Sequence, residues 1–168
     1  MRIVIRNLTR DNDKELILPM DINALEKELR NDEYIIIDYY GAVHPDEYSS
    51  ITELNEFLLE YGDIKEELAI LSATYYYEEV LEMVRKGSYR IIDFTAETMN
   101  WGCGKDIHNE DSLGRVMHEH GLRFDWERKY PIAEEMEDDI QWENLWTTAE
   151  CTGWRTVRYK DNYYIVHR

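Results

Sequence analysis

The sequence predicts an α+β protein built of small lobes: an N-terminal antiparallel sheet plus a helix, a central helical cluster, and C-terminal helices with a closing β-hairpin. Three observations indicate this fold class. Apolar residues alternate with a strand period near both ends of the chain, helical spacing dominates its middle, and no internal repeat or Pro-rich linker divides it. Of the 168 residues, 43% are hydrophobic and 12% aromatic, so the chain can bury a core despite a formal net charge of −17.

The first lobe is predicted over residues 1–61 and begins with strands. Ile3 and Ile5 alternate with Arg2, Val4 and Arg6, which is a strand period, and a second apolar run follows at residues 15–20 after turn-forming residues. Asp21 is expected to cap a helix, because its side chain can accept a hydrogen bond from a backbone N–H of the first turn. Residues 34–40 are rich in β-forming side chains, which predicts a third strand.

A further helix is expected to end this lobe. It starts at Ser49 or Ser50, and its apolar residues recur at i, i+3, i+4 and i+7 from Leu54. That spacing places them on one buried face. Gly62 is expected to end the helix in the C′ position, where glycine is common.

The central lobe, residues 62–103, is predicted to be mainly helical. Asp63 is expected to cap its first helix, and a second helix is expected near residues 75–86, closed by Gly87. Short connections between helices favour a compact antiparallel cluster. Residues 89–94 are predicted to form a strand.

The C-terminal lobe, residues 104–168, combines helices with a hairpin. Helices are expected at 112–120, 131–140 and 143–151, and strands at 154–159 and 163–167. Pro131 suits the first position of a helix, and three polar residues between the two strands favour a tight turn.

The charge balance excludes several classes of function. With 36 acidic residues against 19 basic ones, the chain lacks the cations that replace phosphate counterions, so neither nucleic acid nor an anionic membrane is an expected partner. No apolar run is long enough to span a bilayer. The N-terminus has no signal-peptide pattern, and two cysteines without a CxxC pair favour reduced thiols, so we expect a cytoplasmic protein.

The acidic residues follow a pattern. No Lys or Arg occurs between Asn31 and Ile64, and Glu53, Glu56 and Glu60 lie at i, i+3 and i+7 of one helix, where like charges repel. Carboxylates about 5–6 Å apart resemble the phosphates along a nucleic-acid strand. We therefore interpret the acidic surface as a phosphate mimic, and a merely solubilising surface is the alternative. The predicted binding surface comprises Asp32, Glu33, Asp38, Asp46, Glu47, Glu53, Glu56, Glu60, Asp63, Glu66, Glu67, Glu78, Glu79, Glu82, Glu134, Glu135, Asp138 and Asp139.

Signals for catalysis or metal binding are weak. His118 and His120 are two residues apart on a predicted helix, so they point apart and do not match the HExxH spacing of zinc enzymes. Cys103 would need a partnered base to act as a nucleophile. We expect no catalytic residue, no metal and no cofactor, and a His-dependent metal hydrolase is the less favoured alternative.

The C-terminal aromatic residues allow two interpretations. Trp142 and Trp146 have helical spacing, which favours packing within the lobe. The alternative is a dimer contact, because interfaces favour Trp and Tyr and a chain of this length follows DNA for only a few turns. The candidate contact residues are Trp142, Trp146, Trp154 and Tyr163.

One segment carries a family resemblance. Asp46–Asn55, DEYSSITELN, resembles the DEYxSIxELN segment of ArdA-type antirestriction proteins, and the order of predicted C-terminal elements is similar to theirs. The resemblance implies an elongated α+β protomer and a homodimer formed through the C-terminal lobe. It also implies that the protein occupies the DNA-binding groove of a type I restriction–modification enzyme.

The prediction from residues and resemblance together is a non-enzymatic, DNA-mimicking inhibitor of such an enzyme. An acidic adaptor that binds an unrelated basic protein is the alternative from another functional class.

Overall fold

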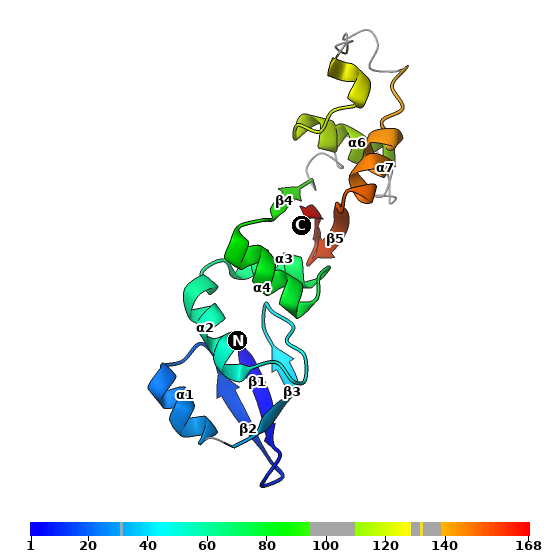
Figure 1. Cartoon of the computed structure of the whole chain (residues 1–168). Coiled ribbons are helices and arrows are strands. Elements are labelled where there is room, and N and C mark those ends of the chain that lie inside the picture. Colours follow the sequence, from blue (N-terminus) through cyan, green and yellow to red (C-terminus); the bar gives the residue numbers. More distant parts are fainter. Residues whose placement is uncertain (31, 95–109, 129–131, 133–138) are drawn as a thin grey trace. The chain divides into compact units, whose positions relative to one another are not determined.

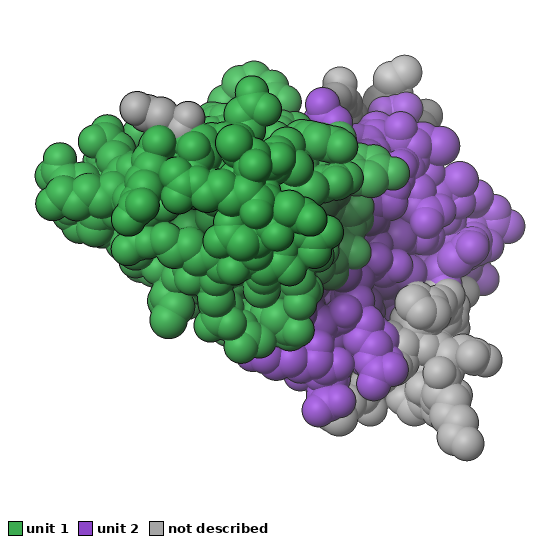
Figure 2. All heavy atoms as spheres, turned by 90° about the horizontal axis from the view of Figure 1, so that it is seen from below, with its two compact units in different colours: residues 1–89 green, residues 90–168 purple. Residues whose placement is uncertain are grey.

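The computed structural model describes residues 1–30, 32–94, 110–128, 132 and 139–168, which form two compact units (Figures 1 and 2). Unit 1 covers residues 1–89 and unit 2 covers residues 90–168. Both combine helices with an antiparallel sheet, so the predicted α+β class is confirmed. The three-lobe division stays a prediction: its first boundary falls inside unit 1, and its second lies outside the described residues.

A three-stranded sheet and a helix begin unit 1. The strands are β1 (Arg2–Asn7), β2 (Asn12–Ile17) and β3 (Tyr34–Tyr40), in the antiparallel order β2-β1-β3, and α1 (Ile22–Leu29) precedes β3. The alternating apolar residues of β1 are fully buried, as their period predicts. Strand β2 starts earlier than the predicted run, because Asn12 already pairs with the last residue of β1.

Three helices complete unit 1: α2 (Ile51–Tyr61), α3 (Lys65–Ser72) and α4 (Tyr77–Lys86). The Ser50 side chain accepts a hydrogen bond from the first turn of α2, which confirms Ser50 as its N-cap. Helix α4 ends at Gly87, whose φ of 60° lies in the left-handed region that glycine adopts without strain.

Two details of the helix ends differ from prediction. Ile64, not Asp63, occupies the N-cap position of α3, and no side chain caps that helix. The chain therefore starts α3 one residue later than a capping Asp63 would allow. Gly62 is the C-cap of α2 with a right-handed φ of −70°, so a left-handed turn does not explain this glycine.

Unit 2 contains a second three-stranded sheet with helices packed against it. Its elements are β4 (Arg90–Asp93), α6 (Glu110–Glu119), the 3-10 helix η1 (Asp125–Arg128), α7 (Glu143–Cys151), β5 (Arg155–Tyr159) and β6 (Asn162–His167). The strand order is β4-β6-β5, all antiparallel. The predicted closing hairpin is confirmed, because Tyr159 pairs with Asn162 across a two-residue turn. The helix predicted at 131–140 lies largely outside the described residues.

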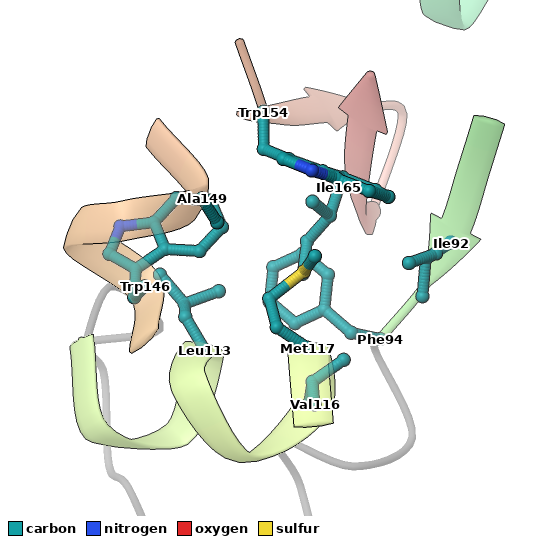
Figure 3. Packing of buried hydrophobic residues seen from close by; sticks show 9 residues of the cluster. All are labelled: Ile92, Phe94, Leu113, Val116, Met117, Trp146, Ala149, Trp154 and Ile165. Carbon is teal, nitrogen blue, oxygen red and sulfur yellow. The ribbon is translucent and has the colours of Figure 1, made fainter. Parts of the chain in front are cut away.

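The core of unit 2 forms where α6 and α7 meet the sheet (Figure 3). Phe94 and Ile165 of the sheet side pack with Met117 of α6 and Trp146 of α7. Gly114 allows the close approach of the two helices, since an added Cβ would lie 1.9 Å from the backbone oxygen of Trp142. Any larger residue at 114 would push α6 and α7 apart.

Candidate acidic interaction surface

Unit 1 carries most of the excess negative charge. Residues 1–89 contain 20 acidic and 9 basic side chains, a formal net charge of −11. Fourteen of the eighteen carboxylates predicted to mimic phosphates belong to this unit. The cations and hydrogen-bond donors around each carboxylate decide how much of its charge is left for a partner.

Helix α2 presents two of these carboxylates to solvent. Glu56 and Glu60 are exposed one turn apart, while Phe57 is buried on the other side of the helix. In the part of the chain that the structure describes, neither glutamate belongs to an ion pair. Like charges at this spacing repel each other, so their repulsion is stored in the folded helix.

Glu53, the third member of this predicted group, is different. Its Oε1 atom accepts a hydrogen bond from Nη1 of Arg85 at 2.9 Å, so α4 supplies the cation that α2 lacks. Glu53 therefore has a cationic partner although its own helix contains no Lys or Arg. Sequence inspection missed the pair because its two residues are 32 positions apart.

Some carboxylates of α3 and α4 have local structural roles. The Tyr89 hydroxyl donates a hydrogen bond to Glu67 at 2.7 Å, and burial together with this bond raises the pKa of Tyr89 to about 12. The backbone N–H of Tyr76 donates to Glu79 at 3.2 Å at the start of α4. Acidic residues in a first helical turn also interact favourably with the helix dipole.

Two further predicted surface residues are paired. Glu82 accepts a hydrogen bond from Lys86 at 2.5 Å, one helical turn away. Asp32 accepts one from Nδ2 of Asn7 at 2.9 Å and lies 3.4 Å from Arg10. The Glu82 contact stays within α4, whereas Asp32 contacts the end of β1 and the turn that follows it.

The remaining predicted residues of unit 1 include eight that are exposed and belong to no ion pair among the described residues. We call them the open carboxylates: Glu33, Asp38, Asp46, Glu47, Glu56, Glu60, Asp63 and Glu78. Seven of the eight lie within the segment that has no Lys or Arg. Glu60 also accepts a hydrogen bond from Tyr61, which raises the pKa of that phenol.

Sequence reasoning missed a buried phenol in unit 1. Tyr77 is 3% exposed, and among the described residues its hydroxyl has no hydrogen-bond partner. Burial raises its pKa well above the usual range, and the charge of Glu53 adds to this shift. The phenol is therefore neutral at physiological pH. The run of three tyrosines at 75–77 could not show which of them is buried.

The predicted acidic residues of unit 2 are only partly described. Asp139 is exposed, whereas Glu134, Glu135 and Asp138 lie outside the described residues. Their part of the predicted surface stays a prediction.

The structure corrects the candidate dimer contact. The tryptophans at 142, 146 and 154 are 3%, 2% and 4% exposed, and Tyr163 is a half-buried neighbour of the same core. Side chains buried inside unit 2 cannot form a contact surface, so the packing interpretation of Trp142, Trp146 and Trp154 is confirmed. The homodimer itself stays a prediction.

The described residues contain no group of three or more His, Cys, Asp or Glu side chains that could hold a metal ion. His118 instead contacts Glu127, with 2.6 Å between Nε2 and Oε1. Cys151 is an exposed free thiol, and Cys103 lies outside the described residues.

Comparisons with known proteins do not place the chain in a family. A scan against protein-family models and a search of curated proteins both found no match to the chain. Among the described helices, none has the length and apolar character needed to cross a bilayer. The site is therefore interpreted from its own geometry and charge.

Proposed function

We propose that this protein is an acidic DNA mimic that occupies the DNA-binding groove of a type I restriction–modification enzyme. The observation that carries the proposal is the set of eight open carboxylates in unit 1. Four of these charges lie on β3, α2 and α4 and four in the connections between elements, and none has an ion-pair partner among the described residues. Ion pairs do form at neighbouring carboxylates such as Glu53. Unpaired charges are costly for folding, which favours a role in contacting a basic partner.

The energetics of DNA binding suit an inhibitor of this kind. Much of the affinity of a DNA-binding protein comes from phosphate contacts that do not depend on sequence. A protein that supplies carboxylates in place of phosphates can therefore compete without reproducing any base. Its net charge of −17 would also speed association with a basic groove through electrostatic steering.

The proposal includes a homodimer, since two copies about a two-fold axis would cover a longer part of the groove. Its contact must use residues other than the three buried tryptophans. Light scattering that shows only a monomer would limit the mimic to a short footprint.

A charge-matched pair of variants tests the role of the open carboxylates. The test variant carries Glu56→Gln, Glu60→Gln and Asp63→Asn. The control removes three carboxylates of unit 1 that are ion-paired with Arg6, Arg2 and Lys14, and carries Asp13→Asn, Glu15→Gln and Glu28→Gln. Both variants lose the same formal charge.

The assay measures displacement of fluorescent DNA from a type I restriction–modification enzyme by anisotropy, between about 50 and 200 mM salt. We expect the test variant to compete more than about tenfold less well, since three exposed charges each contribute up to about 1 kcal/mol. The control should stay within about threefold of the unchanged protein. If the protein without substitutions does not displace DNA, or displaces it equally well at all salt concentrations, the result would favour the alternative, an acidic adaptor that binds an unrelated basic protein.

A further inference from the structure

A series of aromatic rings crosses unit 2 and ends at the surface. The His118 ring meets Trp142 edge-on with 5.0 Å between centroids, and Trp142 lies 5.9 Å from Phe124. Phe124 in turn stacks on Trp126, with 5.0 Å between centroids and 14° between planes. Trp126 is 41% exposed, whereas the other large hydrophobic side chains that the structure describes in unit 2 are buried or half-buried.

Partly buried hydrogen bonds hold Phe124 and Trp126 in place. The side chain of Glu127 is 10% exposed; its Oε1 atom lies 2.6 Å from Nε2 of His118, and its Oε2 atom accepts the backbone N–H of Phe124 at 2.5 Å. Because Glu127 lies within η1, these contacts fix the segment that carries Trp126. The exposed indole is therefore preorganised rather than a loose surface side chain.

Trp126 lines a cavity of about 330 Å³ that combines aromatic, amide and carboxylate groups. Among the described residues, its lining comprises Phe124, Trp126, Asp139, Ile140, Gln141 and Asn144. Nδ2 of Asn144 donates a hydrogen bond to Oε1 of Gln141 at 2.9 Å, which orients both amides. Within the described ranges no ion pair neutralises Asp139, and no cation lies over the Trp126 ring.

We propose that this cavity binds the guanidinium group of an arginine side chain from a protein partner. A guanidinium is planar, stacks on an indole face, and donates hydrogen bonds to carboxylate and amide oxygens, which are the groups present here. The carboxylate of Asp139 disfavours a nucleotide, because it would repel the phosphate. The site lies in unit 2, so it stands whether or not the open carboxylates of unit 1 displace DNA.

The test follows the indole N–H signals of the full-length, ¹⁵N-labelled protein by NMR. The probes are three blocked tripeptides, Gly-Arg-Gly, Gly-Lys-Gly and Gly-citrulline-Gly, with adenosine as a neutral stacking ligand. Citrulline has the shape of arginine without its charge. We expect the arginine peptide to shift the Trp126 signal saturably, the lysine peptide to bind more weakly, and the citrulline peptide to bind at least about fivefold more weakly.

Three variants separate recognition from folding. Trp126→Ala should abolish the effect while the remaining indole signals keep their positions, which shows that unit 2 is folded. Asp139→Asn should weaken arginine binding at least about threefold, whereas Asp161→Asn, at the fully exposed turn of the hairpin, should not change it.

Other outcomes would overturn the proposal. These are no shift with the arginine peptide, equal shifts with the citrulline or lysine peptide, stronger binding of adenosine, or equal effects of the two aspartate substitutions.

Discussion

Replacing Asn55 with alanine should destabilise unit 1 strongly. Asn55 is a fully buried residue of α2, and its Oδ1 atom accepts the backbone N–H of Met20 at 2.8 Å. Its Nδ2 atom donates to the carbonyl oxygen of the same residue at 3.0 Å. The side chain thus holds α2, which carries Glu56, against the segment between β2 and α1.

The size of the effect follows from the groups left without partners. Alanine would remove the partners of one N–H and one C=O of Met20, and an unsatisfied group costs about 1–3 kcal/mol when it is fully buried. Because Met20 is half-buried, we expect the free energy of unfolding to fall by about 1–4 kcal/mol. That is a large part of the stability of a typical domain, which is about 5–15 kcal/mol.

Urea denaturation followed by far-UV circular dichroism measures this loss. All five tryptophans lie at residues 101–154, so their fluorescence, recorded alongside, follows unit 2 separately. The control is Asn23→Ala on the exposed side of α1, which should change the stability by no more than about 0.5 kcal/mol. A loss below about 1 kcal/mol for Asn55→Ala would refute the argument from the two hydrogen bonds.

Two other predictions concern charge. Arg85→Gln leaves Glu53 without its cation, so affinity for the basic target should rise severalfold with a steeper salt dependence, measured by the anisotropy assay; weaker binding would contradict this. The pKa of Tyr89 is about 12 in the folded chain, raised by burial and Glu67, against about 10 unfolded. Its contribution to stability is therefore present below pH 10 and lost as the pH rises towards 12. Between pH 10 and pH 12, the denaturation midpoint of Tyr89→Phe should fall less than that of the protein without the substitution. Equal falls would exclude Tyr89 as the source of the pH dependence.

Much of the local structure could be predicted from the sequence. The period of apolar residues located β1, the β-forming side chains of residues 34–40 located β3, and the capping residues Asp21 and Ser50 marked the starts of two helices. These features depend on hydrogen bonds and side-chain directions within a few residues, which the linear order of residues already contains. The prediction that Asp63 caps α3 was wrong, because Asp63 is only one of several positions from which that helix could start.

The candidate site could be predicted in composition but not in pairing. The sequence alone established that residues 31–64 contain acids and no Lys or Arg, and hence where charge accumulates. Only the tertiary structure decided that Arg85 pairs with Glu53 while Glu56 stays open, and that Trp142, Trp146 and Trp154 are core rather than surface. The reason is physical: charge is a property of each residue, whereas neutralisation and burial depend on side chains that folding brings together from distant positions.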